Sequence, residues 1–182
     1  MGLITVLGPD GAGKTTLANN LASTIQDCRY RYLGHNPNKR HYRIGSRLIR
    51  IAEKLSLPGW LMKALLIYMN DWFDAHDKGL MATDRYVYDH VVLARLNRRP
   101  IRAWFHRWLC RLFPRPQVVI LLMGDAKVIA ARKGELSTDQ TLQYMKLYEQ
   151  ELARYKIEPI KLDSSSYDQQ QLMELLHEHG IC

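Results

Sequence analysis

The chain has 182 residues, of which 47% are hydrophobic and 24% are charged, so it has the length and composition of a globular protein with a proper core. Its formal net charge of +8 favours anionic partners, which are nucleotides, phosphorylated molecules, nucleic acid or an acidic membrane face. Three cysteines without metal-ligand spacing, no signal peptide and no run long enough to span a bilayer predict a cytoplasmic protein.

The first predicted element is a short buried strand over residues 3–7, which is almost wholly apolar. It leads into Gly8-Pro-Asp-Gly-Ala-Gly-Lys-Thr15, which fits the phosphate-loop pattern G-x-x-x-x-G-K-[ST]. Glycines let the backbone amides curl around phosphate oxygens, Lys14 adds a charge between the outer phosphates, and the Thr15 hydroxyl can ligate Mg²⁺. A helical pattern then runs to Ile25, so its positive end faces the same phosphates. The residues expected to bind the nucleotide are Asp10, Gly11, Ala12, Gly13, Lys14, Thr15 and Thr16.

Strands and helices alternate through the rest of the chain. Apolar runs and alternation predict further strands over residues 29–33, 79–83, 118–123 and 157–162. Apolar residues at helical spacing predict helices near 48–55, 61–72, 86–97, 101–113, 126–135 and 139–155, and a last helix that ends at Gly180. The alternation predicts an α/β protein with the three-layer P-loop NTPase fold, in which helices flank a five-stranded parallel sheet, as a single domain over residues 1–182.

Asp84 and Arg85 directly follow the third predicted strand. Ligands bind at the carboxyl ends of the strands in an open parallel sheet, where an acid can hold Mg²⁺ or its water and an arginine can grip a phosphate. An exposed ion pair at the turn is the alternative interpretation. Asp125 follows the strand over 118–123 in the same way, so it is a second candidate for the acid beside the metal.

Arg132 and Lys133 end a helical stretch and precede Gly134, at which the chain could hinge. Phosphoryl transfer needs positive charge on the migrating group, and a mobile arginine often supplies it. Two solvated charges at the end of a helix are the alternative.

Together these three landmarks resemble the thymidylate kinase family of nucleoside-monophosphate kinases. The matching motifs are the phosphate loop with an acid at Asp10, the sequence Asp84-Arg85-Tyr86, and Arg132-Lys-Gly-Glu135, which is similar to the family's lid and defines a lid near 132–138. The resemblance implies ATP and Mg²⁺ as cofactors, and it places Asp10 near the acceptor sugar's 3′-hydroxyl. Gly11 inside the loop implies that the lid carries the catalytic arginine. The residues implied to be catalytic are Lys14, Asp84, Arg85 and Arg132, with Thr15 and Asp84 on the side of the metal.

The acceptor half departs from the family. Residues 67–73 lack the arginine that reads thymine in the family, Asp89 replaces a serine, and Leu33-Gly-His-Asn-Pro replaces an Arg-x-Pro-Gly element. An acid near the acceptor favours hydroxyl-rich ligands over a thymine ring, so thymidylate is expected to be a poor substrate. The acceptor therefore stays open between a nucleoside monophosphate, another small phosphorylated or hydroxylated molecule, and a sugar of surface-polysaccharide synthesis. A non-catalytic nucleotide-dependent binding protein is the alternative of a different class.

The stretch from Arg95 to Arg115 is rich in arginine and has no counterpart in the resemblance. Its large apolar residues recur at helical spacing and are Trp104, Phe105, Trp108, Leu109 and Leu112. The favoured interpretation is an amphipathic core helix with a solvated basic face, ahead of a membrane-surface contact or a nucleic-acid face. No nucleic-acid partner is expected, whereas a peripheral membrane contact near 101–113 and a homodimer stay open.

Overall fold

The computed structural model describes residues 2–33, 59–76, 78–167, 169–178 and 180–181, which contain five strands in one parallel sheet. The strands are β1 (Gly2–Leu7), β2 (Cys28–Tyr32), β3 (Leu80–Asp84), β4 (Val118–Met123) and β5 (Ile160–Asp163). Their order across the sheet is β2-β3-β1-β4-β5, so β1 is central. Because β3 and β4 flank β1 on opposite sides, a crevice for a ligand forms beyond its carboxyl end.

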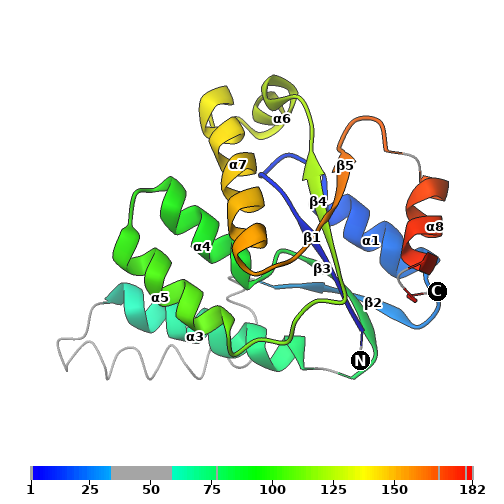
Figure 1. Cartoon of the computed structure of the whole chain (residues 1–182), viewed down its shortest axis with the longest axis horizontal. Coiled ribbons are helices and arrows are strands. Elements are labelled where there is room, and N and C mark those ends of the chain that lie inside the picture. The colour runs from blue at the N-terminus through cyan, green and yellow to red at the C-terminus, as the bar shows by residue number, and fades with distance from the viewer. Residues whose placement is uncertain (1, 34–58, 77, 168, 179, 182) are drawn as a thin grey trace.

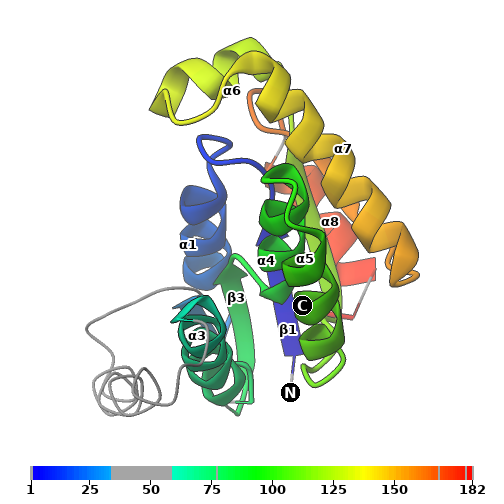
Figure 2. The same cartoon turned by 90° about the vertical axis from the view of Figure 1, so that its left-hand side faces the viewer.

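Seven helices of the described chain cover the sheet (Figures 1 and 2). They are α1 (Lys14–Thr24), α3 (Gly59–Ala75), α4 (Val87–Leu96), α5 (Pro100–Cys110), α6 (Ala126–Lys133), α7 (Thr138–Arg154) and α8 (Gln169–Glu178). One face of the sheet carries α1 and α8, while α4, α5 and α7 lie on the other side, and α6 lies at the end toward which the β4 arrow points (Figure 1). This is the three-layer α/β arrangement that the sequence predicts.

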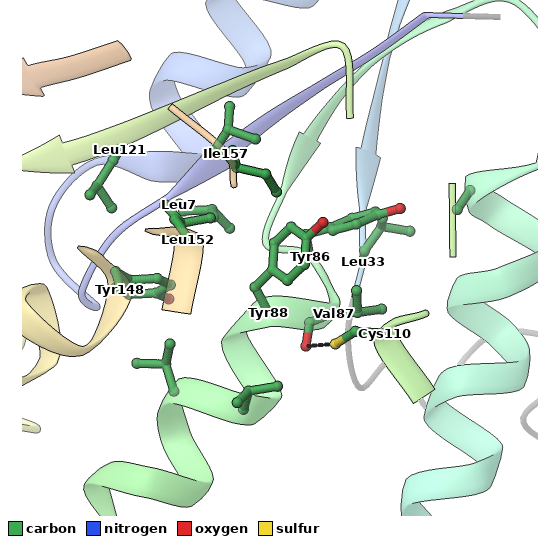
Figure 3. Packing of buried hydrophobic residues seen from close by; sticks show 14 of the residues in the cluster. Leu7, Leu33, Tyr86, Val87, Tyr88, Cys110, Leu121, Tyr148, Leu152 and Ile157 are labelled. Atoms are coloured by element: carbon green, nitrogen blue, oxygen red, sulfur yellow. Dashed lines mark hydrogen bonds between the residues drawn. The ribbon is translucent and has the colours of Figure 1, made fainter. Parts of the chain in front are cut away.

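Alternate residues of the central strand feed two separate cores. In β1, Leu3 and Leu7 pack on the side of α4 and α7, whereas Ile4 and Val6 pack on the side of α1 and α8. This follows from the two-residue period of a strand and requires apolar residues throughout a strand that is covered on both faces. Figure 3 shows the first core, where the Cys110 thiol donates a weak hydrogen bond of 3.6 Å to a backbone carbonyl at the start of α4.

The five predicted strands are all present, and β4 has the predicted bounds. The last strand is shorter than predicted, because it begins at Ile160 rather than at residue 157. The Ile157 amide instead donates to the Leu152 carbonyl at 3.0 Å and so closes the end of α7, and Pro159 has no amide with which to extend the ladder. The helix predicted near 48–55 lies outside the described residues.

Helix α5 differs from its prediction in length and in the side chains that it buries. It ends at Cys110 rather than at residue 113. The amides of residues 111–113 donate 3₁₀-type hydrogen bonds to carbonyls three residues earlier, and Pro114 follows. Its core contacts come from Ala103, Leu109 and Cys110. The residues predicted to line the core but found at least half exposed are Trp104, Trp108 and Leu112.

Two further features of the helices bear on the sequence predictions. In α7, Leu142 was predicted on the buried face but is 52% exposed, while Met145, Tyr148 and Leu152 are buried as predicted. Its neighbours Thr141, Tyr144 and Met145 are buried, so the covered face of α7 lies beside Leu142 rather than over it. Among the helices that the structure describes, none is long and apolar enough to cross a membrane.

Candidate active site

The phosphate loop joins the end of β1 to the first turn of α1 at the carboxyl edge of the sheet. Gly13 precedes α1 with a φ of 89°, which is a left-handed conformation that favours glycine. Gly11 has a φ of 93°, and a Cβ there would lie 2.6 Å from the Ile129 carbonyl oxygen of α6. The loop therefore requires glycine both for its curl and for its close contact with α6.

Two cations meet on one carboxylate of this loop. Lys14 is buried, and its Nζ donates to the Pro9 carbonyl at 2.9 Å and to Asp10 Oδ1 at 3.1 Å. Arg85 Nη2 donates to the same Oδ1 at 2.7 Å. Burial alone would raise the pKa of Asp10, but Lys14 and Arg85 outweigh it and hold that pKa below its ordinary value. Asp10 thus stays ionised and holds both cations over the loop.

The Asp84 carboxylate lies beside the loop at the end of β3 and is only 2% exposed. The Thr15 hydroxyl donates to its Oδ2, while its Oδ1 is buried without a hydrogen-bond partner. A hydroxyl oxygen and an unsatisfied carboxylate oxygen suit Mg²⁺, which prefers oxygen ligands and keeps several waters or phosphate oxygens. This pair is therefore the candidate metal site. The described residues contain no cluster of three His, Cys, Asp or Glu side chains that could hold a metal ion.

Asp125, the second candidate for the acid beside the metal, has a different role in the structure. It is the N-cap of α6, and its carboxylate accepts the Lys127 amide at 2.8 Å. It does not line the cavity of the phosphate loop. The structure therefore brings Asp84, rather than Asp125, to Thr15.

The phosphate loop lines a cavity of about 320 Å³, hereafter the donor cavity. Its lining residues are Asp10, Gly11, Gly13, Lys14, Thr15, Thr16, Tyr32, Asp84, Arg85 and Lys133. Of the loop residues predicted to bind the nucleotide, all line this cavity except Ala12, which is buried. The predicted lid residue Arg132 does not line it.

A second cavity of about 340 Å³, hereafter the acceptor cavity, adjoins the first. It is lined by Tyr32, Leu33, Lys63, Ile67, Arg85, Tyr86, Asp89, His90, Leu93 and Tyr144. Tyr32 and Arg85 line both cavities, so a group bound in one lies next to a group bound in the other. Two adjoining cavities that share a cation can hold two substrates with their reacting ends together.

Arg85 has an unusual backbone, since its φ of 75° is rare for a residue other than glycine. Its guanidinium carbon lies 6.0 Å from the centre of the Tyr32 ring. Burial alone would lower the pKa of Arg85, but the charges of Asp89 and Asp10 raise it above its ordinary value. The guanidinium therefore remains charged in a partly buried position, where it can bind an anionic group.

Asp89 lines the acceptor cavity, but its carboxylate already has protein partners. Oδ2 accepts the Tyr86 amide at 2.7 Å at the start of α4, and Oδ1 accepts the Tyr148 hydroxyl. Burial raises the pKa of Tyr148, and the charge of Asp89 raises it further, so the hydroxyl stays protonated and donates. Asp89 therefore lies beside the acceptor cavity, as the sequence predicts, and both of its oxygens already accept hydrogen bonds from the protein.

The lid residues lie where α6 ends at Gly134, which has a left-handed φ of 67°. Arg132 is exposed, and its Nη1 donates to the Gly11 carbonyl at 3.4 Å, on the rim of the loop. Lys133 lines the donor cavity, and its charge contributes to the lowered pKa of Asp10. Both cations lie in the lid, but only Lys133 of the two lines the cavity of the phosphate loop, whereas Arg132 lies at the rim of the loop.

Several lining residues were not found from the sequence. Tyr32 ends β2, so the rule that ligands gather at the carboxyl ends of strands could have found it. Lys63 of α3 and Tyr144 of α7 reach the acceptor cavity only through tertiary packing, and neither carries a motif. The buried Asp71 lies in the stretch that lacks the family's arginine, and its Oδ2 is 3.8 Å from Nε2 of His90. The centres of the His90 and Tyr68 rings are 5.2 Å apart.

The fold and the site define an α/β nucleotide-binding protein of the P-loop class, with the phosphate loop after the central strand and an Asp-Arg pair after its neighbour. The chain belongs to the thymidylate kinase family, since the family model described as thymidylate kinase matches residues 6–167. The protein is therefore an ATP-dependent kinase of the nucleotide-kinase type.

Solved structures share this fold. Thymidylate kinase from Candida albicans is 18% identical, with a TM-score of 0.72, and the match covers 98% of this chain and 92% of that one. Deoxyadenosine kinase from M. mycoides with bound dATP is 13% identical, with a TM-score of 0.65, and the match covers 97% of this chain and 98% of that one. These identities show the fold alone. Among curated proteins, no sequence matches the chain.

Proposed function

We propose that the protein transfers the γ-phosphoryl group of ATP, bound with Mg²⁺ in the donor cavity, to a small acceptor in the acceptor cavity. The observation that carries this proposal is the buried Asp84 carboxylate, of which one oxygen accepts the Thr15 hydroxyl and the other has no partner. A buried carboxylate oxygen without a partner is unfavourable, and a divalent cation at this position would satisfy it. Residues 1–182 would act as a single kinase domain with a lid near 132–138.

Each residue of the donor cavity has a proposed role. The amides from Asp10 to Thr16 would bind the phosphates, with Lys14 turning from Asp10 toward the β- and γ-phosphates. Thr15 and Asp84 would hold Mg²⁺, which when bound supplies positive charge between the phosphate oxygens. Arg132, with Lys133 beside it in the lid, would stabilise the charge on the migrating phosphoryl group.

In the acceptor cavity, Arg85 would bind an anionic group of the acceptor and orient its oxygen toward the γ-phosphorus. That oxygen forms the new P–O bond while the bond to the β–γ bridging oxygen breaks, and ADP leaves. Asp10 holds Arg85 and Lys14 on one oxygen, so it would align the two substrates where they meet. Because its pKa is lowered, Asp10 is suited to accept a hydrogen bond rather than to remove a proton. Positioning and charge stabilisation carry this reaction.

The acceptor is proposed to be a nucleotide or a related phosphorylated molecule other than thymidylate. Arg85 favours an anionic acceptor, and the names of the similar structures, thymidylate kinase and deoxyadenosine kinase, favour a nucleotide or nucleoside. The stretch over residues 67–73 has the buried Asp71 and no arginine, so a fork for the thymine edge is absent there. A site without the specifying polar contact discriminates poorly in favour of that base.

The test is acceptor-dependent ADP release, measured with ATP–Mg²⁺ and a panel of nucleoside monophosphates, nucleosides and sugar phosphates. Lys14→Ala should abolish turnover and leave the unfolding transition almost unchanged, because the hydrogen bonds of the Lys14 ammonium go to Pro9 and Asp10 of the loop itself. The matched control is Lys161→Ala, which should keep full activity. It removes an exposed lysine of β5 that pairs with Glu149 of α7. Near-normal turnover of Lys14→Ala would refute the assignment of the phosphate loop. ATP binding without turnover of any acceptor would favour the non-catalytic alternative.

A further inference from the structure

A third cavity, of about 560 Å³, lies between α5 and the end of α7 and shares no residue with the donor or acceptor cavity. Its lining consists only of aromatic and basic residues, which are Trp104, Arg107, Trp108, Arg111, Arg154, Tyr155 and Lys156. Figure 1 shows that α5 lies at the opposite end of the molecule from α6, which carries the lid. This cavity therefore has its own chemistry and is separate from the kinase site.

An apolar stripe runs along the outer face of α5 beside this cavity. Ile101 is 75% exposed, Trp104 67%, Trp108 50% and Leu112, just beyond the helix, 54%. The spacing of three, four and four residues keeps these side chains on one line of the helix. The opposite side of the same helix, at Ala103, Leu109 and Cys110, is buried against the core. Large apolar side chains gathered in a row at the surface indicate a surface that binds something apolar.

The charge around this stripe is strongly positive. Arg98 and Arg99 are exposed at the start of α5, and Arg111 and Lys156 are exposed beside the cavity. Glu151 is the acid that the described structure places among these cations, and it is fully buried. It accepts from Arg95 at 2.7 Å and from Arg107 at 2.6 and 2.9 Å, and it lies 3.9 Å from Arg154. One carboxylate shared among three arginines leaves a net positive face.

We propose that this face of α5, with the cavity behind it, binds the surface of an anionic membrane. A helix that lies on a bilayer buries an apolar stripe rich in tryptophan and holds basic side chains at the level of the headgroups. The cations of the cavity are placed to bind lipid phosphates, and Ile101 and Leu112 extend the stripe beyond the two tryptophans. Aromatic and basic side chains also bind single-stranded nucleic acid, but bases stack on aromatic rings, and Ile101 and Leu112 offer none. The membrane explains the whole stripe.

The experiment is co-sedimentation of the full chain with vesicles of phosphatidylcholine alone or of phosphatidylcholine mixed with phosphatidylglycerol. The wild type should bind the anionic vesicles, fail to bind the neutral ones, and dissociate at high salt. Arg111→Glu combined with Lys156→Glu should weaken binding at least about 25-fold, since each basic residue near an anionic surface contributes about fivefold. Trp104→Ala combined with Trp108→Ala should weaken it by about tenfold or more. Lys127→Glu combined with Lys146→Glu makes the same change in net charge on exposed parts of α6 and α7, and it should bind nearly as the wild type does.

ADP release should be unchanged in all these variants, because none of their positions lies in the donor or acceptor cavity. Binding is measured below the unfolding transition of each variant, since Trp108 is half-buried and its removal lowers the Tm. Equal binding to neutral and anionic vesicles, or full binding by the Arg111 and Lys156 double variant, would overturn the proposal. So would failure of the wild type to bind the anionic vesicles, and tryptophan-dependent binding of a single-stranded oligonucleotide would then identify nucleic acid as the occupant. A dimer of the wild type that the tryptophan double variant converts to a monomer would show that a second copy covers this face, and it would overturn the proposal as well.

Discussion

Asp84→Asn is the sharpest test of the candidate metal site. The amide keeps the shape of the side chain and can still accept the Thr15 hydroxyl, but it removes the negative charge that would hold Mg²⁺. In the wild type without ligands, one buried carboxylate oxygen lacks a partner. A neutral amide pays a smaller desolvation penalty at such a position. The free energy of unfolding without ligands should therefore stay equal or rise by up to about 1 kcal/mol, while kcat/KM falls.

The magnitudes follow from the size of the protein and the strength of the metal contact. For a chain of 182 residues, about 1 kcal/mol corresponds to roughly 2–4 °C in Tm. A ligand at about 100 times its Kd stabilises the folded state by about 2.7 kcal/mol, so ATP–Mg²⁺ should raise the Tm of the wild type by roughly 5–11 °C. Loss of a metal contact worth about 3–4 kcal/mol in the transition state should lower kcat/KM by roughly 10²–10³.

The assay is thermal unfolding of wild type and variant, each measured alone, with ATP and EDTA, and with ATP and Mg²⁺. In Asp84→Asn the increment that depends on Mg²⁺ should disappear, whereas the increment from ATP alone should remain. Asp125→Asn is the matched control, because asparagine caps a helix about as well as aspartate and Asp125 lies outside the donor cavity. A full Mg²⁺ increment in Asp84→Asn, or its loss in Asp125→Asn, would refute the assignment of the metal to Asp84.

Three further outcomes are expected. Arg132→Ala should lower kcat by roughly 10³–10⁵ with little change in the KM for ATP, and a loss below about tenfold beside a larger loss in Lys133→Ala would transfer the role to Lys133. Tyr148→Phe leaves the buried Asp89 without one donor, so it should destabilise the fold by about 2 kcal/mol and lower the Tm by roughly 4–8 °C. The control Tyr30→Phe on β2 should leave the Tm unchanged, and equal Tm values for the two variants would contradict this expectation. Thymidylate at saturating ATP should give a kcat/KM at least about 100-fold below that of the best acceptor in the panel, and brisk saturable turnover of thymidylate would make the plain thymidylate kinase assignment correct.

The sequence alone was enough to predict the sheet and the phosphate loop, because both depend on local patterns. A continuous apolar run identifies β4, the glycine pattern identifies the loop, and the alternation of strands with helices predicts a parallel sheet. The same local patterns were less accurate at the ends of elements. At Ile157 and after Cys110, backbone amides bond to carbonyls of the preceding helix, and a pattern of apolar residues does not contain that information.

The choice between similar residues was made only by the tertiary structure. Asp84 and Asp125 both follow an apolar strand, and what separates them is the three-dimensional path of the chain, which turns Asp125 back to cap α6 while β3 ends beside Thr15. In the lid, the direction of the last turn of α6 brings Lys133 rather than Arg132 into the donor cavity.

The acceptor cavity and the exposed face of α5 were also beyond the sequence. Lys63, His90 and Tyr144 come from three helices that are far apart in the chain, so no spacing between them could have indicated that they line one cavity. Trp104 and Trp108 have the helical spacing of core residues, but the core lies on the other side of α5. A sequence determines which face of a helix is apolar, because side-chain period is local. Which face meets the protein and which meets solvent depends on the packing of all the other elements, and only the tertiary structure decides it.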